Sequence, residues 1–415
     1  MIVKEVAPSS WKRLHFYTFR VHSLSHSLFK TAKPVHGSVF AILGRDQPIF
    51  PNLRWLDPSD ELCTPSVLQF FSTTTMVGVI LHFSPTLHLK DLESSLVHLV
   101  SKCPALKTLE LWPSCEDRTQ KPALSNLSSL ISHLPDLEIL RFGRLLCFNS
   151  AFVQCTASLS KLRNLGLTLH HMYHLNPNEY SSISNGFPSL KDLVLTGDSA
   201  ALSGFLNAIK SPIAVVTVYW AEYRITESQA TPLFVAIGRL TSLQVFRLRP
   251  EMAVPNLPGT SLHPLYQLTR LREVELDCRL TLTEKDTAEM ASAWPLVESL
   301  RILRWVSTGS HSVPPVQSLS HFVQRCPQLR SLAYPIQPTV PLEPLILPRP
   351  FPSGIHPLRE FCSRVYDNVP NPAAMAHTLH QIFPRLKEVK HQNWRWNGVQ
   401  RVLDSMDTDE AVRIL

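Results

Sequence analysis

The segment Cys103-Pro104-Ala105-Leu106-Lys107-Thr108-Leu109-Glu110-Leu111 contains a phrase that recurs along this chain. The phrase joins a small apolar residue and a proline to the spacing Leu-x-x-Leu-x-Leu. Side chains alternate between the two faces of a strand, so Leu109 and Leu111 point to one face and Glu110 to the other. The phrase therefore predicts a short strand that is buried on one side.

Eleven copies of this spacing begin between Leu106 and Leu386 and recur every 28 residues on average. A weaker copy starts at Phe50-Pro51-Asn52-Leu53, and the apolar run 75–83 is predicted as another strand. We therefore expect about twelve units. The eleven triplets are Leu106/Leu109/Leu111, Leu137/Leu140/Phe142, Leu162/Leu165/Leu167, Leu190/Leu193/Leu195, Val215/Val218/Trp220, Leu243/Phe246/Leu248, Leu271/Val274/Leu276, Val297/Leu300/Ile302, Leu329/Leu332/Tyr334, Leu358/Phe361/Ser363 and Leu386/Val389/His391.

Between the strands, apolar residues recur at helical spacing, as in Leu89, Leu92, Leu96 and Leu99. One such unit buries too little apolar surface to offset its ordering entropy, so it has to stack on its neighbours. The predicted fold class is an α/β solenoid with a curved parallel sheet on the concave side and helices and irregular segments on the convex side. A doubly wound α/β sheet is the alternative. It would not repeat the triplet at a near-constant step, and it favours glycine-rich turns.

Composition limits the function classes. The 415 residues carry 40 Lys and Arg against 33 Asp and Glu, a net charge of +7, without a run of five basic residues. We therefore expect no nucleic-acid partner. The first residues lack the apolar core of a signal peptide, and no apolar stretch is long enough to span a bilayer, so we expect no membrane partner. The eight cysteines form no C-x-x-C pair, which indicates reduced thiols in a cytoplasmic or nuclear protein.

No catalytic or cofactor motif is present, so we predict a protein that is not an enzyme, with no cofactor and no metal ligands. Gly197-Asp198-Ser199 is similar to the nucleophile block of a lipase family, but the Asp-x-x-His pair of that chemistry is missing. His170, His171 and His174 could hold zinc on a helix. They follow a predicted strand and precede Asn176-Pro177, so a surface turn is favoured.

The triplets resemble the leucine-rich-repeat family, in its longer ribonuclease-inhibitor-like or cysteine-containing form, over about residues 50–390. That family usually has Asn or Cys three residues after the last Leu. Other residues stand there in this chain, so we expect irregular turns: Ser114, Leu145, His170, Asp198, Glu251, Arg279 and Trp305.

The segment Trp11–Leu24 (WKRLHFYTFRVHSL) resembles the helix that follows the F-box in fungal F-box proteins. Phe50–Leu56, Trp294–Leu300 and Cys326–Leu332 are similar to later segments of that family. The resemblance implies an intracellular substrate-recognition subunit of a cullin-type ubiquitin ligase, whose repeats hold the substrate. The F-box itself is absent here, so a ligase adaptor is expected as a partner only if an F-box lies upstream. The alternative is a free-standing repeat scaffold or inhibitor unrelated to ubiquitin.

Three parts are expected. Residues 1–48 form a helical cap and link, with a helix over Trp11–Leu28. Residues 49–392 form the solenoid, and residues 393–415 form a C-terminal helical cap. Eight prolines in residues 335–357 predict an extended strap in place of an outer helix.

We expect a protein substrate to bind in the concave groove, because the strands hold their outward side chains rigidly. Three consecutive predicted strands carry arginine, then acidic residues, then arginine, and this charged patch is expected to be flanked by two aromatic residues. The alternative is that these charged side chains only form ion pairs with one another on the surface and bind no partner. The candidate protein-binding residues are Trp112, Arg141, Tyr219, Arg247, Arg249, Glu273, Glu275, Asp277 and Arg301.

Overall fold

A computed structural model gives the structure of this chain. The residues that it describes are 13, 16–25, 48–58, 68–83, 89–113, 127–143, 150–169, 183, 185–222, 225–251, 256–304, 313–337, 356–363, 369–391 and 396–414. The chain divides into two compact units. Unit 1 comprises Met1–Thr196 with Ala208–Ser211, and unit 2 comprises Gly197–Asn207 with Pro212–Leu415.

The strands of each unit follow one another in chain order, and every pair whose register is known is parallel. One further strand, β10, lies off this order and pairs with β11. The strands of unit 1 are β1 (Ser23–Ser25), β2 (Trp55–Asp57), β3 (Gly78–Phe83), β4 (Thr108–Pro113), β5 (Ile139–Phe142), β6 (Asn164–Leu169) and β7 (Asp192–Gly197). Those of unit 2 are β8 (Val215–Trp220), β9 (Val245–Pro250), β10 (Asn256–Pro258), β11 (Glu273–Thr281), β12 (Ser299–Arg304), β13 (Ser331–Ala333), β14 (Glu360–Ser363) and β15 (Glu388–His391).

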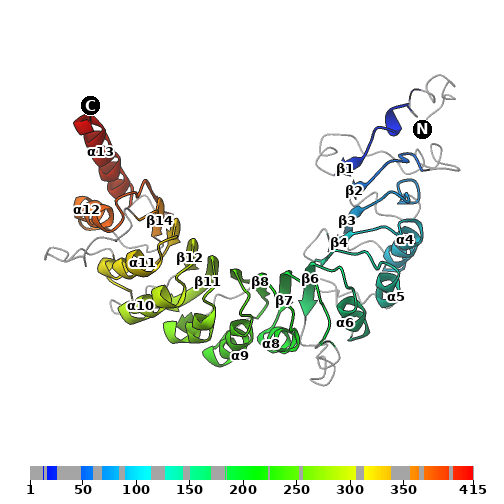
Figure 1. Ribbon diagram of the computed structural model, residues 1–415, viewed down its shortest axis with the longest axis horizontal. Coiled ribbons are helices and arrows are strands. Elements are labelled where there is room, and N and C mark those ends of the chain that lie inside the picture. Colours follow the sequence, from blue (N-terminus) through cyan, green and yellow to red (C-terminus); the bar gives the residue numbers. More distant parts are fainter. Residues whose placement is uncertain are drawn as a thin grey trace. The chain divides into compact units, whose positions relative to one another are not determined.

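Helices connect the strands and, in each unit, lie on one side of them (Figure 1). In unit 1 they are α4 (Leu89–Lys102), α5 (Leu127–Ser132) and α6 (Ser150–Ala157). The α8 helix (Ser199–Ala208) belongs to unit 2 except for its last residue, Ala208. Those of unit 2 are α9 (Glu227–Gly238), the 3-10 helix η4 (Gly259–Gln267), α10 (Glu284–Ala293), the 3-10 helix η5 (Val316–Leu319), α11 (Ser320–Arg325), α12 (Pro372–Ile382) and α13 (Asn397–Ile414).

The recurring phrase forms a tight turn ahead of most strands. In Cys103-Pro104-Ala105-Leu106 the N–H of Leu106 donates to the carbonyl of Cys103, 3.2 Å away. The same bond joins Leu134 to Leu137, and Cys326 to Leu329. Proline suits the second position of such a turn because its ring fixes φ near −65°. The first and last residues of these turns are almost fully buried, so the turn delivers the first leucine of each triplet into the core.

A shared backbone acceptor joins successive repeats at the start of most strands. The carbonyl of Gln244 accepts the N–H groups of both Arg272 and Glu273, at 2.7 and 3.0 Å. The carbonyl of Arg272 in turn accepts those of Glu298 and Ser299. In unit 1 the carbonyl of Lys107 does the same for Glu138 and Ile139. The repetition of this contact sets the register of one strand on the next.

The triplet side chains fill the core between strands and helices. Leu106, Leu109 and Leu111 are at most 1% exposed, and Leu243, Phe246 and Leu248 are fully buried. The repeats are about 28 residues long, their strands are parallel, and their triplets stack in the interior. This arrangement defines a leucine-rich-repeat solenoid, as predicted. The strand expected in 75–83 is β3, and the helix expected near Leu89 is α4.

The triplet predicted as Val215/Val218/Trp220 starts two residues too late. The register pairs Val216 with Phe246 and Val218 with Leu248, so the triplet begins at Ile213, which is fully buried. The prediction of Val215/Val218/Trp220 was wrong because Val215, Val216, Val218 and Trp220 are all apolar, and the spacing alone fits either frame.

The N-terminal prediction also needs correction. The helix expected over Trp11–Leu28 does not extend to its end, because Ser23–Ser25 form β1 and pair in parallel with β2. Most of the proline-rich strap lies outside the described residues, as does the cluster of His170, His171 and His174. The boundaries at 48/49 and 392/393 stay predictions.

Among the described residues, no helix combines the length and the apolar character needed to cross a membrane.

A buried histidine fixes the end of the proline-rich segment in unit 2. His356 is 4% exposed. Its Nδ1 accepts the N–H of Leu358 at 3.3 Å, so the proton must be on Nε2, which donates to the carbonyl of Cys326 at 3.0 Å. Burial lowers the pKa of His356 below its ordinary value of 6.5, although the bond to Cys326 opposes this.

We expect this histidine to make the free energy of unfolding fall in acid. The lowered pKa favours the neutral ring in the folded state, so its contribution is present above pH 6.5 and is lost as the pH falls through the pKa of the folded state. Urea unfolding of wild type and His356→Gln between pH 7.5 and 5 measures this. The wild type should lose more stability than the variant over that range. Parallel pH profiles would contradict the assignment.

Candidate protein-binding face

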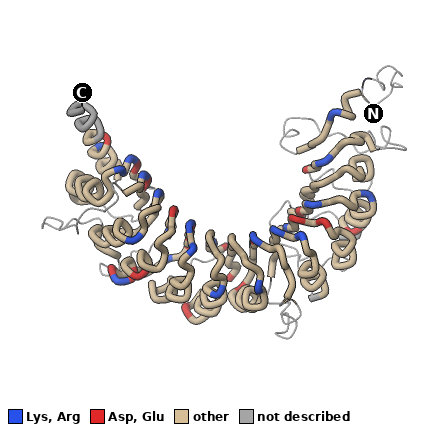
Figure 2. Tube along the Cα trace, viewed as in Figure 1, with Lys and Arg blue, Asp and Glu red and all other residues tan. Residues whose placement is uncertain are grey.

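The strand side of unit 2 carries a charged cluster on β9, β11 and β12. Arg247 and Arg249 stand on β9, Glu273 and Glu275 on β11, and Arg301 on β12. These positions alternate with buried apolar residues, so their side chains leave the strands on the face opposite the core. Figure 2 shows basic and acidic positions together along these strands.

Arg247 and Glu273 form a two-pronged ion pair. Nε and Nη2 of Arg247 donate to the two carboxylate oxygens of Glu273 at 2.8 and 3.0 Å. This bond raises the pKa of Arg247 against the effect of desolvation. Both side chains are 32% exposed, so the pair is fixed in geometry yet reachable from solvent.

Glu275 is the centre of the cluster. Its side chain is only 5% exposed, and its two oxygens accept from Arg249 on one side, at 2.9 Å, and from Arg301 on the other, at 3.2 Å. The side chains of Arg249 and Arg301 are 43% and 44% exposed. The carboxylate is thus covered while its two guanidinium partners face solvent.

Tyr219 and Asp277 border this cluster. Tyr219 is in register with Arg249 on the neighbouring strand and is hydrogen-bonded to it. Asp277 lies beyond Leu276, where the register between β11 and β12 shifts. Both side chains are half-buried, so the cluster has an aromatic edge at β8 and an acidic edge at the far end of β11.

A second polar network lies on the strand side of unit 1. Arg141 on β5 donates from Nε to Oδ1 of Asn164 at 2.8 Å and lies 3.7 Å from Glu110. Asn164 donates to Asp192 at 2.6 Å, and the indole N–H of Trp112 donates to Glu110 at 3.0 Å. Arg141 and Trp112 are therefore held in place, and both stay half-exposed.

The structure brings together most of the predicted residues, but in two groups. Tyr219, Arg247, Arg249, Glu273, Glu275, Asp277 and Arg301 lie on neighbouring strands of unit 2, whereas Trp112 and Arg141 belong to unit 1. The predicted rows of opposite charge do form ion pairs. Asn164 was not anticipated. Asn164 directly precedes Leu165 of the triplet Leu162/Leu165/Leu167, so the alternation of strand side chains could have predicted that it lies on the outward face.

The Gly197-Asp198-Ser199 segment has a structural explanation. Asp198 accepts the N–H groups of Ala200 and Ala201 at 3.1 and 3.0 Å and so caps α8. The hydroxyl of Ser199 donates to Glu222 at 2.6 Å, and the indole N–H of Trp220 donates to both. These bonds satisfy a buried tryptophan, and none of them links Ser199 to a histidine base.

The cysteines in the described part of the chain are all free thiols: Cys103, Cys155, Cys278, Cys326 and Cys362. Burial raises the pKa of Cys103 to about 11 and of Cys278 and Cys326 to about 12. At neutral pH these three are protonated packing groups and poor nucleophiles.

Comparison with known proteins gives distant structural likenesses only. No family model matches the chain, and no curated protein matches its sequence. The solved structures similar to it include the leucine-rich-repeat protein LegL7 of Legionella pneumophila, at 10% identity and a TM-score of 0.34, covering 84% of this chain and 96% of that one. An internalin of Listeria monocytogenes, InlF, is 10% identical with a TM-score of 0.35, covering 97% and 98%. The Rad7–Elc1 complex of yeast is 12% identical with a TM-score of 0.41, covering 92% and 88%.

We expect Glu275→Ala to lower the free energy of unfolding by about 2 kcal/mol, because the substitution removes the buried carboxylate that accepts hydrogen bonds from Arg249 and Arg301. Glu138→Ala is the matched control. It removes an exposed pair with Lys107, whose side chains are 51% and 32% exposed, and should cost less than about 1 kcal/mol. Urea unfolding measures both. An equal effect of the two substitutions would show that Glu275 does not organise the cluster.

Proposed function

We propose that this chain is a non-enzymatic protein-binding scaffold whose partner docks on the strand side of the repeats. The cluster around Glu275 is the observation that carries the proposal. It combines a buried acceptor with guanidinium groups that are oriented and exposed, and a tyrosine lies at its edge. Arginine and tyrosine are typical anchors of protein interfaces, and preorganised side chains lose little entropy on binding.

The chemistry of the face indicates the kind of partner segment. Arg249 and Arg301 present their charge to solvent, while the carboxylate between them is covered. A partner that brings carboxylates or backbone carbonyls could accept hydrogen bonds from these guanidinium groups. We therefore propose a protein partner with a segment that presents acidic side chains or unpaired backbone carbonyls to these arginines.

A finer proposal is that the chain is the substrate-recognition part of an F-box-type subunit of a cullin ubiquitin ligase. It rests on the resemblance of Trp11–Leu24 to the segment after the F-box in fungal proteins. Exposed aromatic side chains in that segment support it, since Phe16, Tyr17 and Phe19 are 53–55% exposed. A free-standing repeat scaffold or inhibitor is the other candidate, and the polar cluster on the strands fits it equally well.

The double variant Arg247→Gln/Arg301→Gln tests the docking face. It removes two exposed charges and leaves Glu275 its bond to Arg249. The variant should lose most of the proteins that the wild-type chain captures by cross-linking and affinity purification. Its thermal unfolding should shift by only a few degrees, since Glu275 keeps one guanidinium partner and the half-exposed Arg247–Glu273 pair contributes up to about 1 kcal/mol.

The matched control is Arg239→Gln/Arg325→Gln, which removes two exposed charges from the helix side of the same unit. This control should capture the same proteins as the wild type. If the strand-side variant also does so, the partner binds elsewhere. An F-box encoded upstream, together with co-purification of a cullin adaptor, favours the ligase proposal. The absence of both favours the free-standing scaffold.

A further inference from the structure

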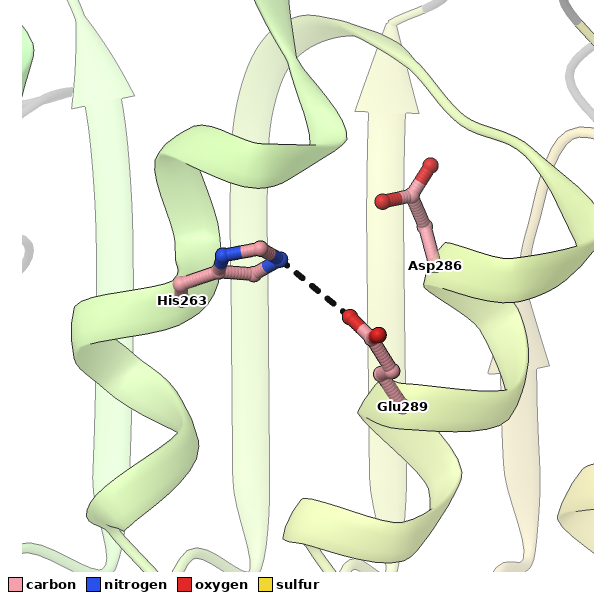
Figure 3. A group of neighbouring side chains, drawn as sticks. All are labelled: His263, Asp286 and Glu289. Atoms are coloured by element: carbon pink, nitrogen blue, oxygen red, sulfur yellow. Dashed lines mark ion pairs between the residues drawn. The ribbon is translucent and has the colours of Figure 1, made fainter.

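Three metal-ligating side chains meet on the helix side of unit 2, away from the strand face. They are His263 on η4, and Asp286 and Glu289 on α10 (Figure 3). Candidate ligand atoms of the three residues lie within 4.8 Å of one another. The two elements belong to successive repeats, so the cluster exists only because those repeats stack.

The contact between His263 and Glu289 is close to the spacing of a metal site. Nε2 of His263 lies 3.2 Å from Oε2 of Glu289. Two ligands of one tetrahedral zinc ion, each bonded at about 2.0–2.2 Å, stand about 3.3–3.6 Å apart, so the pair needs to open by only a few tenths of an ångström. Their side chains are 49% and 35% exposed, so an ion can reach them from solvent.

Asp286 is held beside this pair by two independent constraints. It belongs to the N-terminal cap of α10, where its Oδ2 accepts the N–H and the hydroxyl of Thr283, both at 2.7 Å. Gly259, the first residue of η4, lies against the carboxyl group. A Cβ at position 259 would lie 2.5 Å from Cγ of Asp286. The cap occupies Oδ2, so Oδ1 is the oxygen that we assign to the ion.

A buried hydroxyl supplies a separate observation at the same place. The hydroxyl oxygen of Tyr266 is buried and has no hydrogen-bond partner in the described part of the structure. Burial raises the pKa of Tyr266, and the charges of Asp286 and Glu289 raise it further. The ring of Tyr266 also packs against that of His263, with centroids 5.3 Å apart.

We propose that His263, Asp286 and Glu289 bind a divalent transition-metal ion, with zinc as the best match. Two carboxylates balance the charge of the ion, and the imidazole favours zinc over magnesium and calcium, which prefer oxygen ligands alone. The ion clamps η4 to α10 and so ties one repeat to the next. Three protein ligands leave a position for water or for a ligand from another molecule.

Isothermal titration calorimetry of the tag-free full chain with zinc chloride tests the site, because it measures the number of zinc ions bound and their affinity. The chain has further histidines and cysteines, so the informative quantity is the difference between variants. His263→Gln and Glu289→Gln should each lose one equivalent of zinc or bind it at least about tenfold more weakly. Both substitutions replace exposed or half-exposed side chains, and thermal unfolding without zinc verifies that the variants fold.

His377→Gln is the matched control, because it removes an exposed histidine from α12 of the same unit. It should bind zinc like the wild type. Zinc should also raise the unfolding temperature of the wild type and of this control, and raise it less in the two site variants. Equal zinc stoichiometry and equal thermal shifts in all four proteins would overturn the proposal. So would binding that appears only at millimolar zinc.

Discussion

The backbone carbonyl shared by two N–H groups at the start of most strands is the contact on which the rest of the structure depends. One backbone oxygen, such as that of Gln244, accepts two N–H groups from the next repeat. This bond fixes where the next strand begins, and the strand register then decides which side chains enter the core. The turn just before the strand completes the arrangement, because it buries the first apolar residue of each triplet.

The strand face follows from that register. Phe246 and Val274 point inward together, so Arg247 and Glu275 must both point outward. The ion pairs between β9 and β11 are diagonal, however, whereas Arg301 on β12 binds Glu275 directly in register. Arg247 is in register with Glu275 but binds Glu273, while Arg249 reaches back to Glu275. The diagonal arrangement lets one buried carboxylate serve two arginines from strands on either side.

Much of the fold was predictable because one periodic signal repeats. The strands at Leu109, Leu140 and Leu165 needed only the alternation of leucines. The signal fails where it becomes ambiguous. At β8 the core face carries Val216, Val218 and Trp220 in succession, so two frames fit. At Ser23–Ser25 the strand is defined by pairing with β2 and not by its own residues.

The candidate sites were predictable to different degrees. Rows of opposite charge on consecutive strands indicated the cluster of Arg247, Glu275 and Arg301, because parallel strands place such rows side by side. The diagonal choice of partners depends on side-chain geometry, which spacing does not encode. The cluster of His263 with Asp286 was missed because no short motif joins the two. Only the stacking of η4 on α10 brings them together.

The central claim is that each repeat is stable only because its neighbours cover it. Amide hydrogen exchange of wild type and Leu248→Ala measures this most directly. The truncation should cost about 2–5 kcal/mol at a fully buried site. Protection should fall most in β9, clearly in the adjacent β8 and β11, and least in the distant β15. An equal loss of protection in all four strands would contradict the account, because it would mean that unit 2 has one indivisible core.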